Sequence, residues 1–196
     1  YEAAYQSLDN YLSRFPNGVF MQEAQFLAAD AALRTEKKAE AYTLYAALEH
    51  SNNREYKLAG LPFLAAQDFA DSNYALARER YDRFARLAES KEQLLRARTG
   101  LMRCADRLGD DQALMEQSTA VLNMDQVSEN LRNEAKRYQA MVYFRQEAYN
   151  QSFLLFSEVQ KATAGATKAE AYYHMALIRQ KQEEYDSSNT LINQMI

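Results

Sequence analysis

Two histidines and one cysteine are the side chains of this sequence best suited to metal binding or nucleophilic chemistry. His50 and His174 lie far apart, and no set of cysteine, aspartate and glutamate completes a metal-ligand pattern around either of them. His174 adjoins Tyr172 and Tyr173, which favours packing or surface exposure over contact with a partner. Cys104 stands between apolar neighbours in the segment LMRCADRL, as expected of a small buried hydrophobe. The sequence therefore predicts no metal site and no cysteine nucleophile.

Other catalytic patterns are also missing from the sequence. It contains no glycine-rich phosphate loop, no nucleophile elbow and no kinase signature. Its carboxylates are numerous, but that is ordinary for helices that face water. We therefore predict that the chain is not an enzyme and binds no cofactor. The formal net charge of −4 argues against nucleic-acid binding. The sequence contains no run of 18 apolar residues, the length that a membrane-spanning helix needs.

The composition favours long helices. Glycine and proline are scarce, at 5 and 2 of 196 residues, and 47% of residues are apolar, enough for a sizeable core. The single cysteine excludes an internal disulfide bond.

The chain opens at Tyr1 with no signal peptide, and Leu191, Ile192, Met195 and Ile196 would cap a repeat array poorly. We therefore expect either a trimmed fragment of a longer array or ends that pair between molecules, and we favour the fragment.

One helical face recurs along the whole chain. It consists of residues at positions i, i+4 and i+7, and successive faces begin 36 to 38 residues apart. The six triplets are Ala4, Leu8 and Tyr11; Ala41, Tyr45 and Leu48; Ala77, Tyr81 and Phe84; Leu114, Ser118 and Val121; Ser152, Phe156 and Val159; and Ser188, Ile192 and Met195. A small or medium residue stands twelve positions before the last five triplets, at Ala29, Ala65, Met102, Ala140 and Ala176. Such a period predicts a solenoid of helical hairpins.

This pattern resembles the tetratricopeptide repeat, in which a helix A with a central small residue precedes a helix B with an Ala–aromatic–apolar face and a closing proline. The proline is kept only at Pro16, in the segment YLSRFPNG, which ends one hairpin before the next. Gly109 keeps the glycine of the turn between A and B, whereas other residues replace it at Glu36, Ser72, Glu147 and Glu183. An aromatic residue follows two positions later at Tyr74, Tyr149 and Tyr185.

The resemblance implies an all-α, right-handed superhelix of about eleven helices. The expected B helices are 1–14, 37–50, 74–88, 111–124, 149–162 and 185–196, and the expected A helices are 19–34, 54–70, 91–108, 128–146 and 166–182. Grouped as one array over 1–196, these give a lone helix B at 1–18 and hairpins at 19–53, 54–89, 90–126, 127–164 and 165–196.

Local signals support several of these helix boundaries. Ser90 with Gln93 and Thr167 with Glu170 fit the capping box, in which the two side chains satisfy free backbone N–H groups at a helix start. Pro62 falls inside an expected A helix, so we expect either a tolerated kink, a helix that restarts at Leu61, or an altered superhelix that shapes a pocket.

The resemblance also implies a binding surface, because tetratricopeptide arrays hold peptides along a concave wall built mainly from A helices. Carried over by position, the candidate protein-binding residues are Phe26, Phe69, Arg103, Arg107, Arg137, Phe144, Arg145, Tyr173 and Lys181. The aromatic residues of the first two repeats would hold an apolar anchor. The arginines and the lysine would either bind an acidic segment or C-terminal carboxylate of the partner, or pair with carboxylates on neighbouring helices.

These patterns suggest three classes of function. The first is a scaffold or adaptor that binds a peptide segment of a partner protein in the concave groove. The second is a regulatory or sensory array attached to an enzyme or signalling domain outside this chain. The third, nucleic-acid binding by a helical repeat as in the pentatricopeptide family, is disfavoured by the negative charge.

The junction YLSRFPNG and the segment EAQFLAADAAL are similar to those of Gram-negative envelope lipoproteins, which suggests a periplasmic or outer-membrane location, with the cytoplasm as the alternative.

Overall fold

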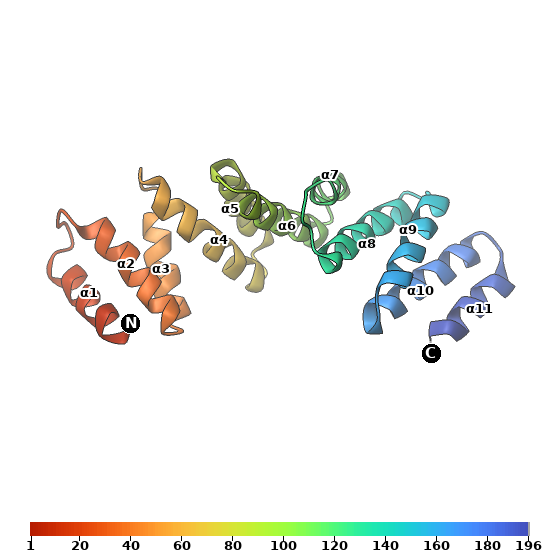
Figure 1. Cartoon of the computed structure of the whole chain (residues 1–196), viewed down its shortest axis with the longest axis horizontal. Coiled ribbons are helices and arrows are strands. Elements are labelled where there is room, and N and C mark those ends of the chain that lie inside the picture. The colour runs from red at the N-terminus through yellow and green to blue at the C-terminus, as the bar shows by residue number, and fades with distance from the viewer. Residues whose placement is uncertain (196) are drawn as a thin grey trace. The chain divides into compact units, whose positions relative to one another are not determined.

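A computed structural model describes residues 1–195, and this part of the chain contains eleven α-helices and no strand (Figure 1). The helices are α1 (Glu2–Arg14), α2 (Met21–Arg34), α3 (Lys38–Leu48), α4 (Arg54–Ala70), α5 (Tyr74–Leu87), α6 (Lys91–Leu108), α7 (Asp111–Leu122), α8 (Glu129–Arg145), α9 (Tyr149–Ala162), α10 (Gly165–Lys181) and α11 (Tyr185–Met195). Every expected helix is present, with ends within two residues of the expected ones. Ile196, the expected last residue of the final helix, lies outside the described residues.

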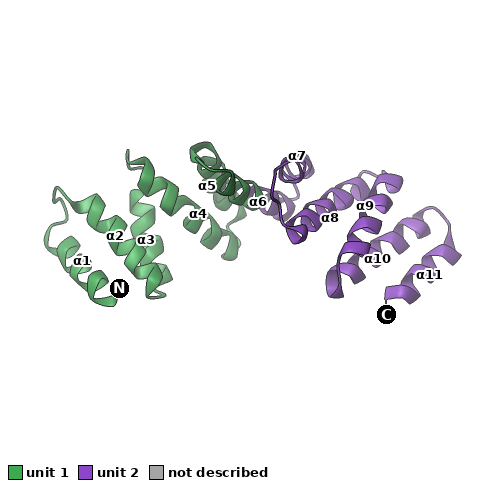
Figure 2. Cartoon of the chain, in the orientation of Figure 1, with its two compact units in different colours: residues 1–100 green, residues 101–196 purple. Residues whose placement is uncertain are grey.

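The chain forms two compact units, unit 1 (residues 1–100) and unit 2 (residues 101–196), and the boundary falls within α6 (Figure 2). Inside each unit, consecutive helices pack on one another: α1 to α5 in unit 1 and α7 to α11 in unit 2. The even-numbered helices are those expected as A helices and the odd-numbered ones those expected as B helices. The finer division into hairpins at the residues given above stays a prediction.

The recurring helical face forms the core. From Ala41 to Val159, every residue of the four middle triplets is at most 9% exposed. The small or medium residue of each A helix is at most 2% exposed, so helix crossings are close there. The first and last triplets differ: α1 has no buried residue, and Ile192 and Met195 are each 38% exposed. These two helices pack extensively against only one described helix each.

Two serines at the start of the recurring face bond directly to the partner helix. The buried Ser152 hydroxyl donates to the carbonyl oxygen of Ala140 at 2.9 Å, and Ser188 donates to Ala176 at 3.0 Å. In both cases donor and acceptor are twelve residues apart, which is the separation between the small residue of helix A and the first residue of the next triplet. A serine therefore replaces alanine at this crossing without leaving a buried polar group unsatisfied.

All five turns between an A helix and the next B helix share one geometry. The residue at the glycine position has a positive φ in each, with values of 61°, 64°, 68°, 59° and 64° at Glu36, Ser72, Gly109, Glu147 and Glu183. Its N–H bonds to the carbonyl three residues back, and the next N–H bonds to the carbonyl five residues back, as in Lys37 to Ala32 at 2.9 Å. This is the Schellman motif. The turn position that the sequence indicated is confirmed, including at the four sites without glycine.

One predicted capping box is confirmed and the other is wrong. The backbone N–H of Gln93 donates to the Ser90 hydroxyl at 3.1 Å, and the side-chain oxygen of Gln93 accepts from the backbone N–H of Ser90 at 3.3 Å. The expected cap at Thr167 fails because α10 begins two residues earlier, at Gly165, and no side chain caps it. Glu170 is instead held by an arginine of α8.

Helix α4 runs without a break through Pro62, which is buried. Gly60, two residues earlier, is also buried, and a Cβ atom there would lie 2.9 Å from the ring of Tyr45. Gly100 has the same relation to the ring of Tyr81, at 2.5 Å. Both tyrosines are middle members of the recurring face, so these glycines allow an A helix to approach the preceding aromatic ring.

Candidate functional site: the A-helix surface and a buried ion network

The aromatic candidate in the first A helix, Phe26, borders a cavity in unit 1. Its ring stacks on Tyr56 with centroids 4.8 Å apart and meets Tyr45 edge-on at 6.3 Å. The cavity has a volume of about 430 Å³. Its lining consists of Phe26, Arg54, Glu55, Leu58, Ala59, Glu89 and Gln93. An apolar floor with a polar rim could accept one apolar side chain.

Phe69 and Phe144 lie at the hairpin turns, where they pack against the tyrosine that begins the next helix. Phe69 meets Tyr74 edge-on at 5.2 Å, and Phe144 meets Tyr149 at 6.0 Å. Each phenylalanine precedes the positive-φ residue by three positions, so the pair packs across the Schellman turn, next to its two hydrogen bonds. Both rings are half-buried, and their contacts stabilise the turn.

Three of the four candidate arginines bind carboxylates of neighbouring helices. Arg103 binds Glu134 through two parallel hydrogen bonds of 2.7 and 2.8 Å. Arg137 donates to Glu170 at 2.9 Å, and Arg145 Nε donates to Asp111 at 3.1 Å. The sequence left open whether these residues bind a partner or the chain itself. The structure pairs each of them with a carboxylate of the chain, and their contact with a partner stays a prediction.

The remaining candidates are exposed. Tyr173 is 49% exposed, and Arg107 and Lys181 are exposed as well. No hydrogen bond or ion pair joins either cation to another described residue. Tyr173 lies one turn after Glu170 on α10, on the same side of the helix.

A second cavity, of about 720 Å³, lies in unit 2 between α8, the end of α9 and the start of α10. Its lining consists of Asn130, Asn133, Glu134, Arg137, Lys161, Ala162, Thr163, Ala164, Thr167 and Glu170. The ion pairs of Arg103 with Glu134 and of Arg137 with Glu170 border it. We call this cavity, together with the adjoining surface of α8, α9 and α10, the unit 2 groove. It is defined by the lining residues Asn133, Arg137, Lys161 and Glu170 and by the neighbouring Tyr173.

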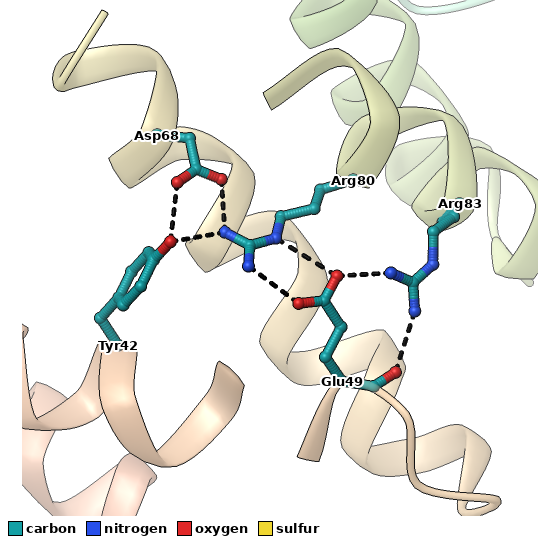
Figure 3. Close-up of polar contacts among 5 residues, drawn as sticks. All are labelled: Tyr42, Glu49, Asp68, Arg80 and Arg83. Carbon is teal, nitrogen blue, oxygen red and sulfur yellow. Dashed lines mark hydrogen bonds and ion pairs between the residues drawn. The ribbon is translucent and has the colours of Figure 1, made fainter. Parts of the chain in front are cut away.

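A buried ion network in unit 1 was not anticipated from the sequence. Arg80 of α5 lies between two carboxylates (Figure 3), donating to Asp68 of α4 at 2.5 Å and to Glu49 at 2.8 and 3.3 Å. The Tyr42 hydroxyl accepts from Arg80 at 2.7 Å and donates to Asp68 at 2.8 Å. Arg83 binds the Glu49 side chain and donates to its backbone carbonyl at 2.9 Å. Arg80, Asp68 and Glu49 are at most 9% exposed.

The network joins α3, α4 and α5 and has no group aimed at a ligand. Burial alone would raise the pKa of Glu49, but hydrogen bonds and charge from Arg80 outweigh it and hold this pKa below its usual range. Burial alone would lower the pKa of Arg80, whereas its bonds to Glu49, Tyr42 and Asp68 raise it. One sequence signal could have revealed the core of the network: Asp68 and Arg80 are twelve residues apart, each three positions after the paired Ala65 and Ala77.

His174 is part of an aromatic cluster in unit 2. Its ring stacks on Phe156 at 4.8 Å and meets Phe144 and Tyr173 edge-on at 5.6 and 5.4 Å. The Nδ1 atom is buried without a hydrogen-bond partner. Burial lowers the pKa of His174, Arg137 lowers it further, and Glu170 opposes both. This half-buried histidine packs against aromatic rings, which is one of the two outcomes that the sequence favoured.

Within residues 1–195, no group of three or more His, Cys, Asp or Glu side chains could hold a metal ion, and Cys104 is buried. In the same range, no helix combines the length and the apolar character needed to cross a membrane.

Together these features define an all-α chain with a tetratricopeptide-like helical-repeat fold. No family model matches the sequence, and no curated protein matches it. The fold is similar to two solved structures of MamA. One has a TM-score of 0.65 at 15% identity and covers 85% of this chain and 91% of that chain; the other has a TM-score of 0.67 at 14% identity and covers 90% of each.

A tetratricopeptide repeat protein from Parabacteroides merdae ATCC 43184 aligns with 97% of this chain and 84% of its own. Its TM-score is 0.49 at 14% identity. At the identities of the two MamA structures, the likeness concerns the fold alone.

Proposed function

We propose that the chain is a protein-interaction scaffold that holds a segment of a partner protein along its A helices. The observation that carries this proposal is the cavity of about 720 Å³ in the unit 2 groove, which opens between two A helices and is lined by polar side chains. A solenoid presents such inter-helix surfaces repeatedly, and extended peptides fit them. The chain would therefore act by binding and not by catalysis.

The partner segment is proposed to carry an apolar side chain and an acidic group. The cavity beside Phe26 in unit 1 suits the apolar side chain. Arg103, Arg137 and Arg145 each already hold a carboxylate of the chain, which neutralises most of the charge that they could offer to an acidic group. We therefore assign attraction of the acidic group to exposed cations such as Arg107 and Lys181, where it is screened by salt over a Debye length of about 8–10 Å.

The alternative is a regulatory array attached to an enzyme or signalling domain, and the same surface is compatible with it. The flanking sequence of the full-length protein distinguishes this alternative from the scaffold, because it would encode the attached domain. A periplasmic or outer-membrane location is likewise proposed from the resemblance alone. Fractionation of the source cells, with an antibody against this chain, distinguishes it from the cytoplasmic alternative.

Site-specific photo-crosslinking in the source cells tests the scaffold proposal. A photoreactive phenylalanine analogue replaces Tyr173 on the A helix α10 or, as a matched control, Leu154 on the B helix α9; the native side chains are 49% and 61% exposed. We expect a discrete crosslinked protein from position 173 and none from position 154. A crosslink from position 154 alone, or from neither position, contradicts the proposal.

A further inference from the structure

His174 occupies a position at which an A helix packs on the B helix before it. It stands two residues before Ala176, the small residue of α10, and its ring stacks on Phe156 of α9 with centroids 4.8 Å apart and planes 8° apart. The same position in α4 is Phe63, whose ring lies 5.8 Å from that of Tyr45 in α3. Phe156 and Tyr45 are both middle members of the recurring face. The stacked ring of His174 is therefore part of the contact between α9 and α10.

The surroundings of this ring are apolar and leave one of its nitrogens without a partner. Phe144 and Tyr173 meet the ring edge-on at 5.6 and 5.4 Å, and Nδ1 is buried without a hydrogen bond. A neutral imidazole loses only one hydrogen bond in such a place. An imidazolium would have to bury a charged N–H donor with no acceptor, which costs far more. Stacking on Phe156 attracts a cation but supplies no acceptor.

Two charged groups act on His174, and they oppose each other. Glu170, one turn earlier on α10, favours the protonated ring, and Arg137 of α8 disfavours it. These two side chains bind each other at 2.9 Å, so neither is a free counter-ion. No charged group in the described parts of α9 and α11 acts on the histidine, and Tyr173 is the other titratable side chain at its ring. Burial is the largest influence and lowers the pKa of His174.

The hairpin of α10 and α11 depends on the contact between α9 and α10 for its place. Among the described helices, α11 packs extensively against α10 alone. Besides the stacked histidine, Gln160 of α9 donates to the Tyr172 hydroxyl at 3.0 Å, and Arg179 lies over the ring of Phe153 at 4.2 Å. Of these side chains, only the histidine is of a type that gains a charge between pH 7.5 and pH 5.5.

We propose that His174 is a pH-sensitive joint of the array: when it takes up a proton, the hairpin of α10 and α11 separates from α9, while α7, α8 and α9 keep their packing. The unit 2 groove would then lose Glu170 and Tyr173, which α10 carries. This consequence rests on the proposed function, whereas the joint itself does not.

The direction of the pH dependence follows from the burial of the ring. In the separated state the histidine is exposed and titrates near its ordinary pKa of about 6.5. The neutral ring stabilises the packed state fully at pH values well above this. That stabilisation is lost as the pH falls from about 6.5 toward the lowered pKa of the packed state.

Hydrogen exchange of the isolated chain at pH 7.5 and pH 5.5, followed by mass spectrometry, tests the joint. Labelling times are scaled so that an unprotected amide exchanges equally at both pH values. We expect peptides from α10 and α11 to exchange about three- to tenfold faster at pH 5.5. Tenfold is the ceiling because this pH lies one unit below the ordinary pKa of histidine. Peptides from α7 to α9 and from unit 1 should not change, and they serve as internal controls.

Variants assign the effect to the histidine. His174→Phe keeps an aromatic ring that takes up no proton, and His174→Gln removes the ring, so both should lose the acid-induced rise. If circular dichroism shows that the phenylalanine variant does not fold, the glutamine variant carries the comparison. The matched control is Tyr173→Phe, which removes the neighbouring phenol and should keep the full rise.

No rise in wild type, an equal rise in the folded His174 variants, loss of the rise in Tyr173→Phe, or an equal rise across α7 to α9 would overturn the joint. The exchange experiment uses the chain without a partner, so its result is separate from that of the crosslinking experiment. A crosslink at position 173 without an acid response leaves the scaffold proposal standing. An acid response without a crosslink leaves the joint standing.

Discussion

Arg80 binds carboxylates from two different elements of unit 1 while it is itself only 6% exposed. Burying an arginine and two carboxylates carries a large desolvation penalty, which good geometry and additional hydrogen bonds offset. Here Tyr42 and Arg83 supply those bonds (Figure 3). A network of this kind fixes the relative placement of α3, α4 and α5 because its charges are satisfied in only one arrangement.

Replacing Arg80 by methionine should therefore lower the free energy of unfolding by about 3–5 kcal/mol, since Asp68 and Glu49 lose their main buried partner. The matched control is Arg86→Met in the same helix. Arg86 binds Asp82 with both side chains largely exposed, and losing such a pair should cost at most about 0.5 kcal/mol. Urea denaturation of the two variants measures both values, and equal effects would contradict a structural role for the network.

His174 should make unit 2 less stable in mild acid. Its folded pKa is lowered by burial, so the unfolded chain takes up the proton first, near the usual pKa of about 6.5. The stabilising effect of the neutral form is then fully present well above this pH and is lost as the pH falls from there toward the folded pKa. The charged groups that act on it, Arg137 and Glu170, are themselves paired.

Thermal or urea unfolding at pH 7.5 and pH 5.5 measures this effect. We expect wild type to lose stability between the two values and His174→Phe, which keeps an aromatic ring in the cluster, to lose less. An equal loss in wild type and His174→Phe would show that the dependence comes from other groups.

At the scale of the element, the A-to-B turns carry local strain at four positions. A left-handed conformation costs a non-glycine residue roughly 1–2 kcal/mol, and Glu36, Ser72, Glu147 and Glu183 all adopt it. Only Gly109 uses the residue suited to this turn. The hairpins form nevertheless, because the buried faces of the paired helices and the two Schellman hydrogen bonds outweigh the strain.

Glu147→Gly should therefore stabilise the chain, by about 0.5–1 kcal/mol after allowance for the greater flexibility of glycine when unfolded. Gln146→Gly, one residue earlier, should destabilise it, because Gln146 has an ordinary φ of −84°. Gly109→Ala should also be destabilising, although a Cβ there meets nothing within 4 Å. Chemical denaturation compares the three variants, and stabilisation by both glycine substitutions would show that the sign of φ is not the cause.

At the scale of the whole molecule, each unit has hydrophobic clusters of its own. Ala29, Tyr45 and Leu64 belong to a cluster in unit 1, and Phe156 and Ile178 belong to one in unit 2. In repeat arrays each element is stabilised mainly by its neighbours, so local changes need not spread along the chain.

Hydrogen exchange of the Arg80→Met variant should show this locality. We expect faster amide exchange in α3, α4 and α5, where the network is lost, and little change in α9 and α10. Mass spectrometry of peptic fragments from wild type and variant measures the difference. A uniform increase across residues 1–195 would show instead that the described chain unfolds as one cooperative body.

The positions of the helices, the buried face and the turns could be predicted from the sequence because each depends on a short-range pattern. Ala77, Tyr81 and Phe84 share one side of a helix at any position in space, and the small residue twelve positions earlier must meet them if the two helices form a hairpin. The turn residues were found in the same way, since the left-handed position follows from where one helix must stop.

What the polar side chains bind was decided only by the tertiary structure. The partners of Arg103, Arg137 and Arg145 lie 31 to 34 residues away, so the choice between a partner protein and the chain itself depends on how the helices pack. Helix packing also decided two other features. Thr167 does not cap α10, and Asn133 lines the same cavity as Lys161 and the start of α10. Hydrophobic periodicity determines which face is buried, but hydrogen bonds are directional and short, and only assembled helices bring these groups within reach of one another.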